Sequence, residues 1–154
     1  MEWIGIEPNQ AMHEFLFEKA NEYNINARLL ECTSENISLP DNSVDYVIST
    51  EVLCSVVDLK QSLKEIFRVL MPNGKFLFLE HVIDKNNFGR RLVQKTVPFT
   101  PWKWYSDGCN PGRDIGSHIN QIGFAKVEYS NYMQEGKGII NLINKPHIYG
   151  YAIK

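Results

Sequence analysis

The stretch from Ser38 to Cys54 constrains the fold of this chain more than any other part of the sequence. Turn-forming residues open it at Leu39–Ser43, and a nearly continuous apolar run follows at Val44–Ile48. Such a run predicts a strand that is covered on both faces. Small and polar residues then interrupt the run at Ser49–Glu51. Because ligands of open α/β sheets bind outside the carboxyl ends of the strands, we expect a ligand at this interruption.

The remainder of the chain alternates strand-like and helix-like patterns, which predicts an α/β domain. Apolar runs predict strands at Trp3–Ile6, Ala27–Cys32 and Lys75–Val82, and helical spacing predicts helices at Gln10–Tyr23, Asp58–Leu70 and Arg113–Ile122. The last two strands are expected at Phe124–Tyr132 and Pro146–Ile153. At 154 residues, the chain is long enough for one domain with a sizeable core.

Charge, cysteine content and hydropathy argue against several classes of protein. The net charge is -2 at pH 7, so the overall charge gives no reason to expect nucleic acid or an acidic membrane surface as a partner. Cys32, Cys54 and Cys109 form neither a disulfide framework nor a zinc motif, so we expect a reducing compartment and no metal. No apolar run reaches the ~18–20 residues of a membrane span, and no signal peptide is visible.

Several stretches carry a resemblance to a known family. Leu39–Ser49 and Lys64–Phe76 are similar to class I S-adenosylmethionine-dependent methyltransferases of the methyltransferase domain 11 type. Four shorter motifs resemble the methyltransferase-like 7 group of membrane-associated thiol S-methyltransferases, namely Val52–Val56, Glu80–Val82, Asp107–Asn110 and Pro146–Lys154. The similarity covers nearly the whole chain and implies a Rossmann-like class I sheet that ends in an antiparallel pair of strands.

The resemblance implies an enzyme that transfers a methyl group from S-adenosyl-L-methionine to a small lipophilic thiol. In such a reaction the cofactor carries the difficult chemistry, and the protein supplies proximity and alignment. The family lies on the cytoplasmic side of intracellular membranes, at the endoplasmic reticulum or lipid droplets. The composition of this chain alone favours a soluble cytoplasmic protein.

Glu7 follows the first predicted strand, where a carboxylate of nucleotide-binding sheets accepts hydrogen bonds from both ribose hydroxyls. From the residues alone, it is equally reasonable that Glu7 caps the helix that follows. The resemblance favours ribose binding, although the family usually has Asp at this position.

Two further segments are expected to bind the cofactor because of the resemblance. The first, Thr33, Ser34 and Glu35, matches the family loop that meets the adenine edge, although its residue types alone favour a solvated turn with local caps. The second, Thr50, Glu51 and Val52, matches the segment that passes beneath the methionine part of the cofactor and faces the acceptor.

His81 and Asp107 are the candidate catalytic residues. His81 ends a buried strand on the expected ligand side, where it could act as a general base or orient the acceptor; a purely structural role is equally compatible with the sequence. Asp107 is a second candidate base. Free thiols have a pKa of about 8.5, so a weak base suffices. Cys54 is expected to be a buried small side chain without chemistry, and His147 to belong to the polar pattern of the last strand.

The segment from Ile83 to Gly112 (83–112) is predicted to be the least regular part and to form an adaptable apolar lid over the acceptor. Prolines and basic residues are mixed there with Phe99, Trp102, Trp104 and Tyr105. Two alternatives are contact of Trp102, Trp104 and Tyr105 with a membrane surface, and a loop that tucks its aromatic side chains onto the core.

The chain departs from the family pattern at its front. The family begins with a strand and a Gly-rich loop, whereas this chain starts at what resembles the second strand and contains no Gly-rich loop. We therefore expect residues 1–154 to form a single partial methyltransferase domain in which Trp3–Ile6 pairs directly with Val44–Ser49. Because half of the cofactor site would be absent, the alternative function is a truncated, inactive remnant or interaction module.

Overall fold

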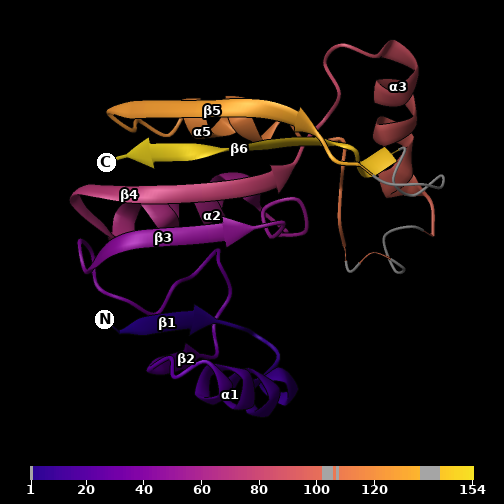
Figure 1. Ribbon diagram of the computed structural model, residues 1–154. Coiled ribbons are helices and arrows are strands. Elements are labelled where there is room, and N and C mark those ends of the chain that lie inside the picture. Colours follow the sequence, from indigo (N-terminus) through magenta and orange to yellow (C-terminus); the bar gives the residue numbers. More distant parts are fainter. Residues whose placement is uncertain (1, 102–105, 107, 136–142) are drawn as a thin grey trace.

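The computed structural model describes residues 2–101, 106, 108–135 and 143–154. Its strands form two separate sheets (Figure 1). A two-stranded parallel sheet pairs β1 with β2, and a four-stranded mixed sheet has the order β3-β4-β6-β5. The strands are β1 (Trp3–Ile6), β2 (Ala27–Leu30), β3 (Val44–Thr50), β4 (Leu70–His81), β5 (Lys126–Met133) and β6 (Pro146–Ile153).

The first sheet is a small β-α-β unit. A short 3-10 turn (Gln10–Met12) and the helix α1 (His13–Glu22) connect β1 to β2. The side chain of Asn9 caps the turn by accepting a hydrogen bond from the amide of Ala11. Both strands and the helix lie close to their expected positions, although α1 contains no fully buried residue.

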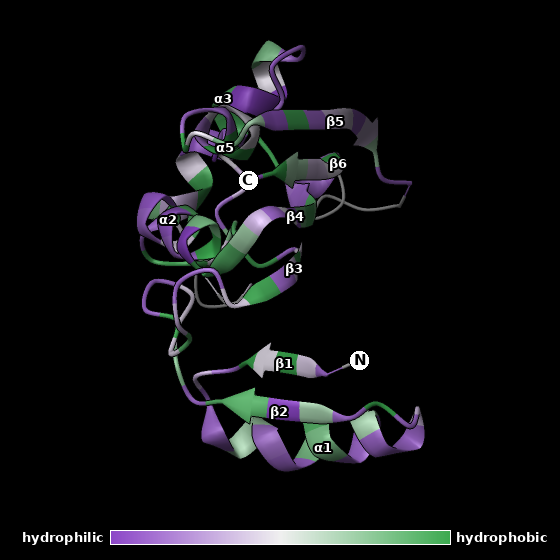
Figure 2. Cartoon of the chain, turned by 90° about the vertical axis from the view of Figure 1, so that its left-hand side faces the viewer, coloured by the Kyte–Doolittle hydropathy of each residue, from purple (hydrophilic) through white to green (hydrophobic). Residues whose placement is uncertain are grey.

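The expected pairing of Trp3–Ile6 with Val44–Ser49 is wrong. The ladder partner of β1 is β2, and β1 and β3 belong to different sheets among the described residues; both views show the two strands standing apart (Figures 1 and 2). Side-chain hydrogen bonds tie the loop between β2 and β3 to the next helix and the residues before it: Glu65 and Glu35 accept from the amides of Ile37 and Val57, and Arg68 donates to the carbonyl of Ile37. These contacts hold the loop between the two sheets against the second one.

The second sheet carries its helices on one face. β3 runs parallel to β4, whereas β6 is antiparallel to both β4 and β5, which confirms the predicted antiparallel pair. The helices α2 (Leu59–Val69) and α5 (Ile115–Asn120) cover the same face of this sheet (Figure 2). The core between them includes Leu63, Ile66, Phe76, Ile115, Ile119 and Ile148.

Local sequence signals explain where α2 begins and ends. The side chain of Asp58 accepts a hydrogen bond from the amide of Gln61 and so acts as the predicted N-cap. The helix ends at Val69, and β4 begins immediately at Leu70 rather than after the Pro-Asn-Gly turn. A register shift opposite Val44 and Tyr46 accommodates the extra residues of that turn.

The segment 83–112 is more regular than the sequence indicated. It contains the helix α3 (Phe88–Thr96), capped by Asn87, and a 3-10 turn at Val97–Phe99. The helix lies beyond the carboxyl ends of β3 and β4, at the right of Figure 1. Within the described ranges, none of the helices has the length and hydropathy that a membrane span requires.

Candidate functional site

The carboxyl ends of β3 and β4 lie next to each other and bring several titratable side chains together. The last ladder pair joins Thr50 to Leu79. The chain leaves β3 at Glu51, a non-glycine residue with a φ of 54°, and the Glu51 amide donates to the carbonyl of Leu79. Left-handed backbone of this kind is held only where the surroundings enforce it. The strained residue therefore marks the start of a constrained loop.

A buried carboxylate holds this loop in place. Glu80 is fully buried, and its side chain accepts hydrogen bonds from the hydroxyl of Ser49 at 2.5 Å and the amide of Leu53 at 3.0 Å. The amide of Val52 lies 3.3 Å from the same carboxylate. Burial raises the pKa of Glu80 to about 7, although these hydrogen bonds act in the opposite direction. Glu80 was not among the expected site residues.

His81 and His147 form a pair of tilted rings next to Glu51, with an interplanar angle of 50°. They are opposite one another in the β4–β6 ladder, and their ring centroids are 4.3 Å apart. The Nε2 atom of His147 lies 3.3 Å from Oε1 of Glu51, and that of His81 lies 4.0 Å from the same oxygen. His147 is fully buried, so it is part of this cluster and not of an exposed polar pattern. No local sequence signal pointed to this position, because His147 reaches the cluster through the long-range pairing of β6 with β4.

Two cysteines complete the cluster on the other side of His81. The Sγ atoms of Cys54 and Cys109 lie 3.7 Å and 3.8 Å from Nδ1 of His81. Hydrogen bonding from Cys109 lowers the pKa of the Cys54 thiol, burial opposes this effect, and His81 lowers it further. The pKa of Cys109 is raised in turn, chiefly by its hydrogen bond to Cys54. Burial lowers the pKa of His81, but Cys54, Glu51 and Glu80 outweigh it and the net shift is upward.

Backbone hydrogen bonds fix the two cysteine-bearing loops to each other. The amide of Asn110 donates to the carbonyl of Cys54 at 2.9 Å. The guanidinium of Arg113 donates to the carbonyls of Leu53 and Val56, at 2.8 Å and 2.6 Å. Both cysteines are buried, as the sequence indicated for Cys54. The cluster therefore consists of two buried thiols and two buried imidazoles, with the exposed carboxylate of Glu51 at its edge.

The expected adenosine-binding residues lie on the first sheet and its following loop. Glu7 is half-buried, and its Oε1 accepts a hydrogen bond from the amide of Asn9 at 2.7 Å. The side chain of Ser34 contacts Ser62, and Glu35 accepts hydrogen bonds from the amides of Val57 and Asp58. Partial burial raises the pKa of Glu35, but the hydrogen bonds to its carboxylate outweigh burial, so the net shift of the pKa is downward. Local hydrogen bonds, such as that from the Ser34 hydroxyl to Glu35, therefore coexist with contacts to α2 and the residues just before it.

The remaining expected residues are placed as follows. Thr33, Thr50 and Val52 are exposed at the carboxyl ends of the strands. Glu51 and His81, each expected on the ligand side of its own strand, lie with Oε1 and Nε2 4.0 Å apart. Asp107, Trp102, Trp104 and Tyr105 lie outside the described residues.

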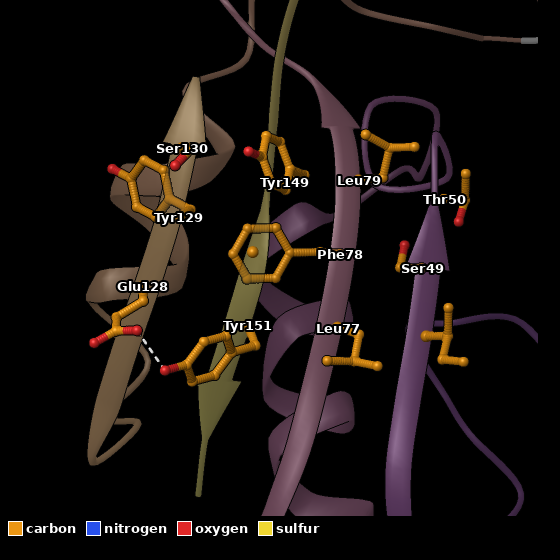
Figure 3. Close-up of a pocket in the computed structure, with 12 residues that line it drawn as sticks. Ser49, Thr50, Leu77, Phe78, Leu79, Glu128, Tyr129, Ser130, Tyr149 and Tyr151 are labelled. Carbon is orange, nitrogen blue, oxygen red and sulfur yellow. Dashed lines mark hydrogen bonds between the residues drawn. The ribbon is translucent and has the colours of Figure 1, made fainter. Parts of the chain in front are cut away.

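A shallow hollow of about 550 Å³ opens on the sheet face that is opposite α2 and α5 (Figure 3). Two rows of side chains line it across all four strands. One row is Ile48, Leu77, Tyr151 and Glu128, and the next is Thr50, Leu79, Tyr149 and Ser130. Tyr151 donates a hydrogen bond to Glu128 within the first row. The hollow is mostly apolar and reaches the site at Thr50.

Comparison with known proteins supports a single family. Residues 1–78 match the methyltransferase domain family. The chain is 32% identical over 152 residues to thiol S-methyltransferase TMT1A of Homo sapiens, and 33% identical over 152 residues to TMT1B of Rattus norvegicus. Each alignment covers 97% of this chain, which spans 61% of the length of either relative. Demethylmenaquinone methyltransferase of Geobacillus is 35% identical over 149 residues, covering 85% of this chain and 63% of that protein.

Solved structures confirm the predicted class I α/β fold. A SAM-dependent methyltransferase of Thermotoga maritima superimposes with a TM-score of 0.67 at 20% identity, covering 97% of this chain and 72% of that chain. Phosphoethanolamine N-methyltransferase 2 of Haemonchus contortus, solved with S-adenosylhomocysteine, superimposes with a TM-score of 0.69 at 14% identity, covering 98% and 43%. At such identities, the likeness supports the fold alone.

Proposed function

We propose, on the premise that this chain belongs to the methyltransferase domain family, that it takes part in methyl transfer from S-adenosylmethionine to a small lipophilic thiol. The observation that carries this proposal is the similarity to thiol S-methyltransferases along nearly the whole chain. The match includes the segments that bear Glu51, Cys54 and His81. These three residues belong to the cluster at the carboxyl ends of β3 and β4.

The residues at these strand ends suit the chemistry of the cofactor. A carboxylate such as Glu7 is suited to accept from two ribose hydroxyls, and its orientation is already held by the amide of Asn9. The side chains of Ser34 and Glu35 are engaged with α2, so the loop 33–35 is proposed to contact the adenine through its backbone. Residues 50–52 are proposed to lie along the methionine part. When bound, S-adenosylmethionine supplies an electrophilic methyl group on a sulfonium sulfur.

The protein's part in the reaction is alignment and proton removal. An acceptor thiol has to lose its proton before its sulfur lone pair can form the new bond to the methyl group. The electrons of the broken carbon–sulfur bond remain with the departing thioether. We propose His81 as the base that takes the proton, with Asp107 as a second candidate. The segment 83–112 is proposed to cover the acceptor, since α3 lies at this end of the sheet and exposes Phe88 and Leu92.

A methyl-transfer assay with matched acceptors tests the proposal. Isotopically labelled S-adenosylmethionine is incubated with the 154-residue chain and either an alkanethiol or the alkanol of equal length. We expect label in the thioether and none in the ether. His81→Gln should lower kcat by about 10²-fold or more, the scale of a lost general base. His118→Gln changes an imidazole on α5 and should leave kcat unaltered.

Three results would contradict this function. Transfer to the alkanol at a similar rate would remove the thiol as the preferred acceptor. A folded chain that fails to bind S-adenosylhomocysteine by calorimetry, with folding confirmed by circular dichroism, would remove the cofactor. Binding without transfer to any acceptor would favour a non-catalytic module instead.

A further inference from the structure

Two cysteines and a histidine that are far apart in the sequence converge at one buried point. Cys54 lies in the loop after β3, His81 ends β4, and Cys109 precedes α5. Their three potential ligand atoms all lie within 4.8 Å of one another, and the residues are between 1% and 8% exposed. Methyl transfer to an external thiol requires neither cysteine. The two cysteines therefore have no part in the proposed function, in which His81 alone of the three residues takes part.

Two of the three distances between these atoms are close to the edges of a tetrahedral metal site. With Zn–S bonds of about 2.3 Å and Zn–N bonds of about 2.0 Å, neighbouring ligand atoms of a tetrahedron stand about 3.5–3.8 Å apart. The two sulfur-to-Nδ1 distances are 3.7 Å and 3.8 Å. Metal binding would therefore require only small movements of the side chains.

The surroundings of the three atoms also suit a metal. The loops that carry Cys54 and Cys109 are held together by the hydrogen bond from Asn110 to the Cys54 carbonyl. Behind the imidazole, Oε1 of Glu51 lies 4.0 Å from Nε2 of His81. A carboxylate that hydrogen-bonds to the far nitrogen is the usual support of a metal-bound histidine. At 4.0 Å Glu51 is beyond hydrogen-bond distance, so it would have to move closer to His81 to give this support.

We propose that Cys54, Cys109 and His81 form a Zn²⁺ site, with both thiolates and Nδ1 of His81 as ligands and a fourth position open to water. Two thiolates and one imidazole favour zinc over magnesium or calcium, which prefer oxygen ligands. The two thiolates also neutralise the charge of the ion, so the buried site is electrically neutral as a whole.

A second set of ligands competes for the same histidine. Glu51 and His147 lie on the Nε2 side of His81 and could hold an ion together with it. This set contains no sulfur, and Glu51 has a side chain that is 41% exposed. The two sets can be distinguished because only the cysteine set gives metal–thiolate bonds.

Cobalt substitution provides the test. The reduced, metal-free chain is titrated with Co²⁺ in a buffer without thiols, cofactor or acceptor, so the result does not depend on the proposed enzymatic activity. We expect one equivalent to give thiolate-to-cobalt charge-transfer absorption and tetrahedral visible bands, both abolished by Zn²⁺. Cys54→Ser and Cys109→Ser should each remove about half of the charge-transfer intensity and weaken zinc binding on the order of 100-fold.

Matched variants complete the test. Cys32→Ser alters the third cysteine, which is outside the cluster, and should leave the spectrum unchanged. Glu51→Gln should weaken zinc binding by about 10-fold without loss of the thiolate band. Absence of a charge-transfer band in the wild-type chain, a band that depends on Cys32, or binding that needs His147 but neither Cys54 nor Cys109 would each overturn the proposal.

A measurement on the wild-type chain guards against variants that fail to fold. Zinc should slow alkylation of Cys54 and Cys109 by iodoacetamide, as read by mass spectrometry, and leave the rate at Cys32 unaltered. Equal rates with and without zinc would overturn the proposal. Because zinc and a proton would compete for His81, a zinc-loaded chain could not use His81 as a base, and zinc is expected to inhibit methyl transfer.

Discussion

The hydroxyl of Ser49 donates a hydrogen bond of 2.5 Å to the fully buried carboxylate of Glu80 and thereby joins the ends of β3 and β4 inside the protein. The same carboxylate accepts from the amide of Leu53, so it also anchors the loop that carries Cys54. Since burial raises the pKa of Glu80 to about 7, this connection depends on pH.

The first prediction concerns stability between pH 4.5 and 7. In this window the folded chain keeps a proton on Glu80, whereas the unfolded chain, with the ordinary pKa of 4.5, has released it. The contribution of Glu80 is therefore fully present below pH 4.5 and is lost as the pH rises through about 7. At 1.36 kcal/mol per pH unit, the free energy of unfolding should fall by about 3 kcal/mol across the window.

Urea unfolding at several pH values checks this dependence. Glu80→Gln cannot ionise, so the difference in unfolding free energy between the wild type and this variant should shrink or reverse as the pH rises. Glu18→Gln removes an exposed carboxylate on α1 and serves as the control. A wild-type curve parallel to that of Glu80→Gln from pH 4 to 8 would contradict the buried, protonated carboxyl group.

The second prediction concerns Arg68, which ties the loop between β2 and β3 to α2. Its guanidinium donates to the carbonyls of Ile37 and Leu39, each at 2.8 Å, and pairs with Glu65 at 2.7 Å. Arg68→Ala leaves these acceptors without their partner and should destabilise the chain by about 2 kcal/mol. Lys64→Ala, on an exposed face of the same helix, should change stability by less than about 0.5 kcal/mol.

Thermal and urea unfolding measure both variants. Arg68→Lys keeps the charge but not the fork of donors, so an intermediate loss is expected. Equal stability of Arg68→Ala and Lys64→Ala would show that the loop is held by other contacts.

Local signals in the sequence were sufficient for most elements of the fold. The bounds of β6 agree with the predicted strand Pro146–Ile153, and Asp58 caps α2 as expected. Such features depend on residues that are adjacent in the chain. The helix α3 was missed because its few apolar residues, such as Phe88 and Leu92, are largely exposed and its proline-rich and aromatic neighbours indicated a loop.

Long-range packing accounts for what the sequence could not predict. The separation of β1 from β3 follows from contacts between the loop 33–41 and α2, which no pattern within either strand encodes. Likewise, Cys54, His81 and Cys109 have no spacing typical of a metal site, and His147 joins the cluster only through strand pairing. Glu51 and His81 were predictable as neighbours because parallel strands end at the same edge of a sheet.

The third prediction tests the close packing of β5 against β6. A Cβ atom at Gly150 would lie 2.1 Å from the carbonyl oxygen of Glu128 and 2.6 Å from Cα of Tyr129. Both are backbone atoms of the paired strand, so they cannot move aside without disturbing the ladder. Gly150→Ala should therefore destabilise the chain by about 3 kcal/mol or more.

Gly89→Ala is the matched control for this substitution. Its Cβ would meet only Oδ1 of Asn87, at 3.5 Å, and Gly89 lies within α3, where alanine is the better helix former. We expect Gly89→Ala to be neutral or to raise the melting temperature. A Gly150→Ala variant as stable as Gly89→Ala would mean that β5 and β6 are further apart than described.

The last prediction concerns Glu7 and the proposed ribose contact. The carboxylate is held by the amide of Asn9 through Oε1, so its second oxygen is the one placed to accept from a ligand hydroxyl. Glu7→Gln exchanges one acceptor oxygen for a donor and removes the charge. The Kd for S-adenosylhomocysteine, measured by calorimetry, should rise by about 10-fold, the effect of losing a charge-assisted hydrogen bond. Glu14→Gln, an exposed residue of α1, should leave the Kd unchanged. If Glu7→Gln binds as tightly as the wild type while Glu7→Ala loses thermal stability, Glu7 would act only in supporting the turn that precedes α1.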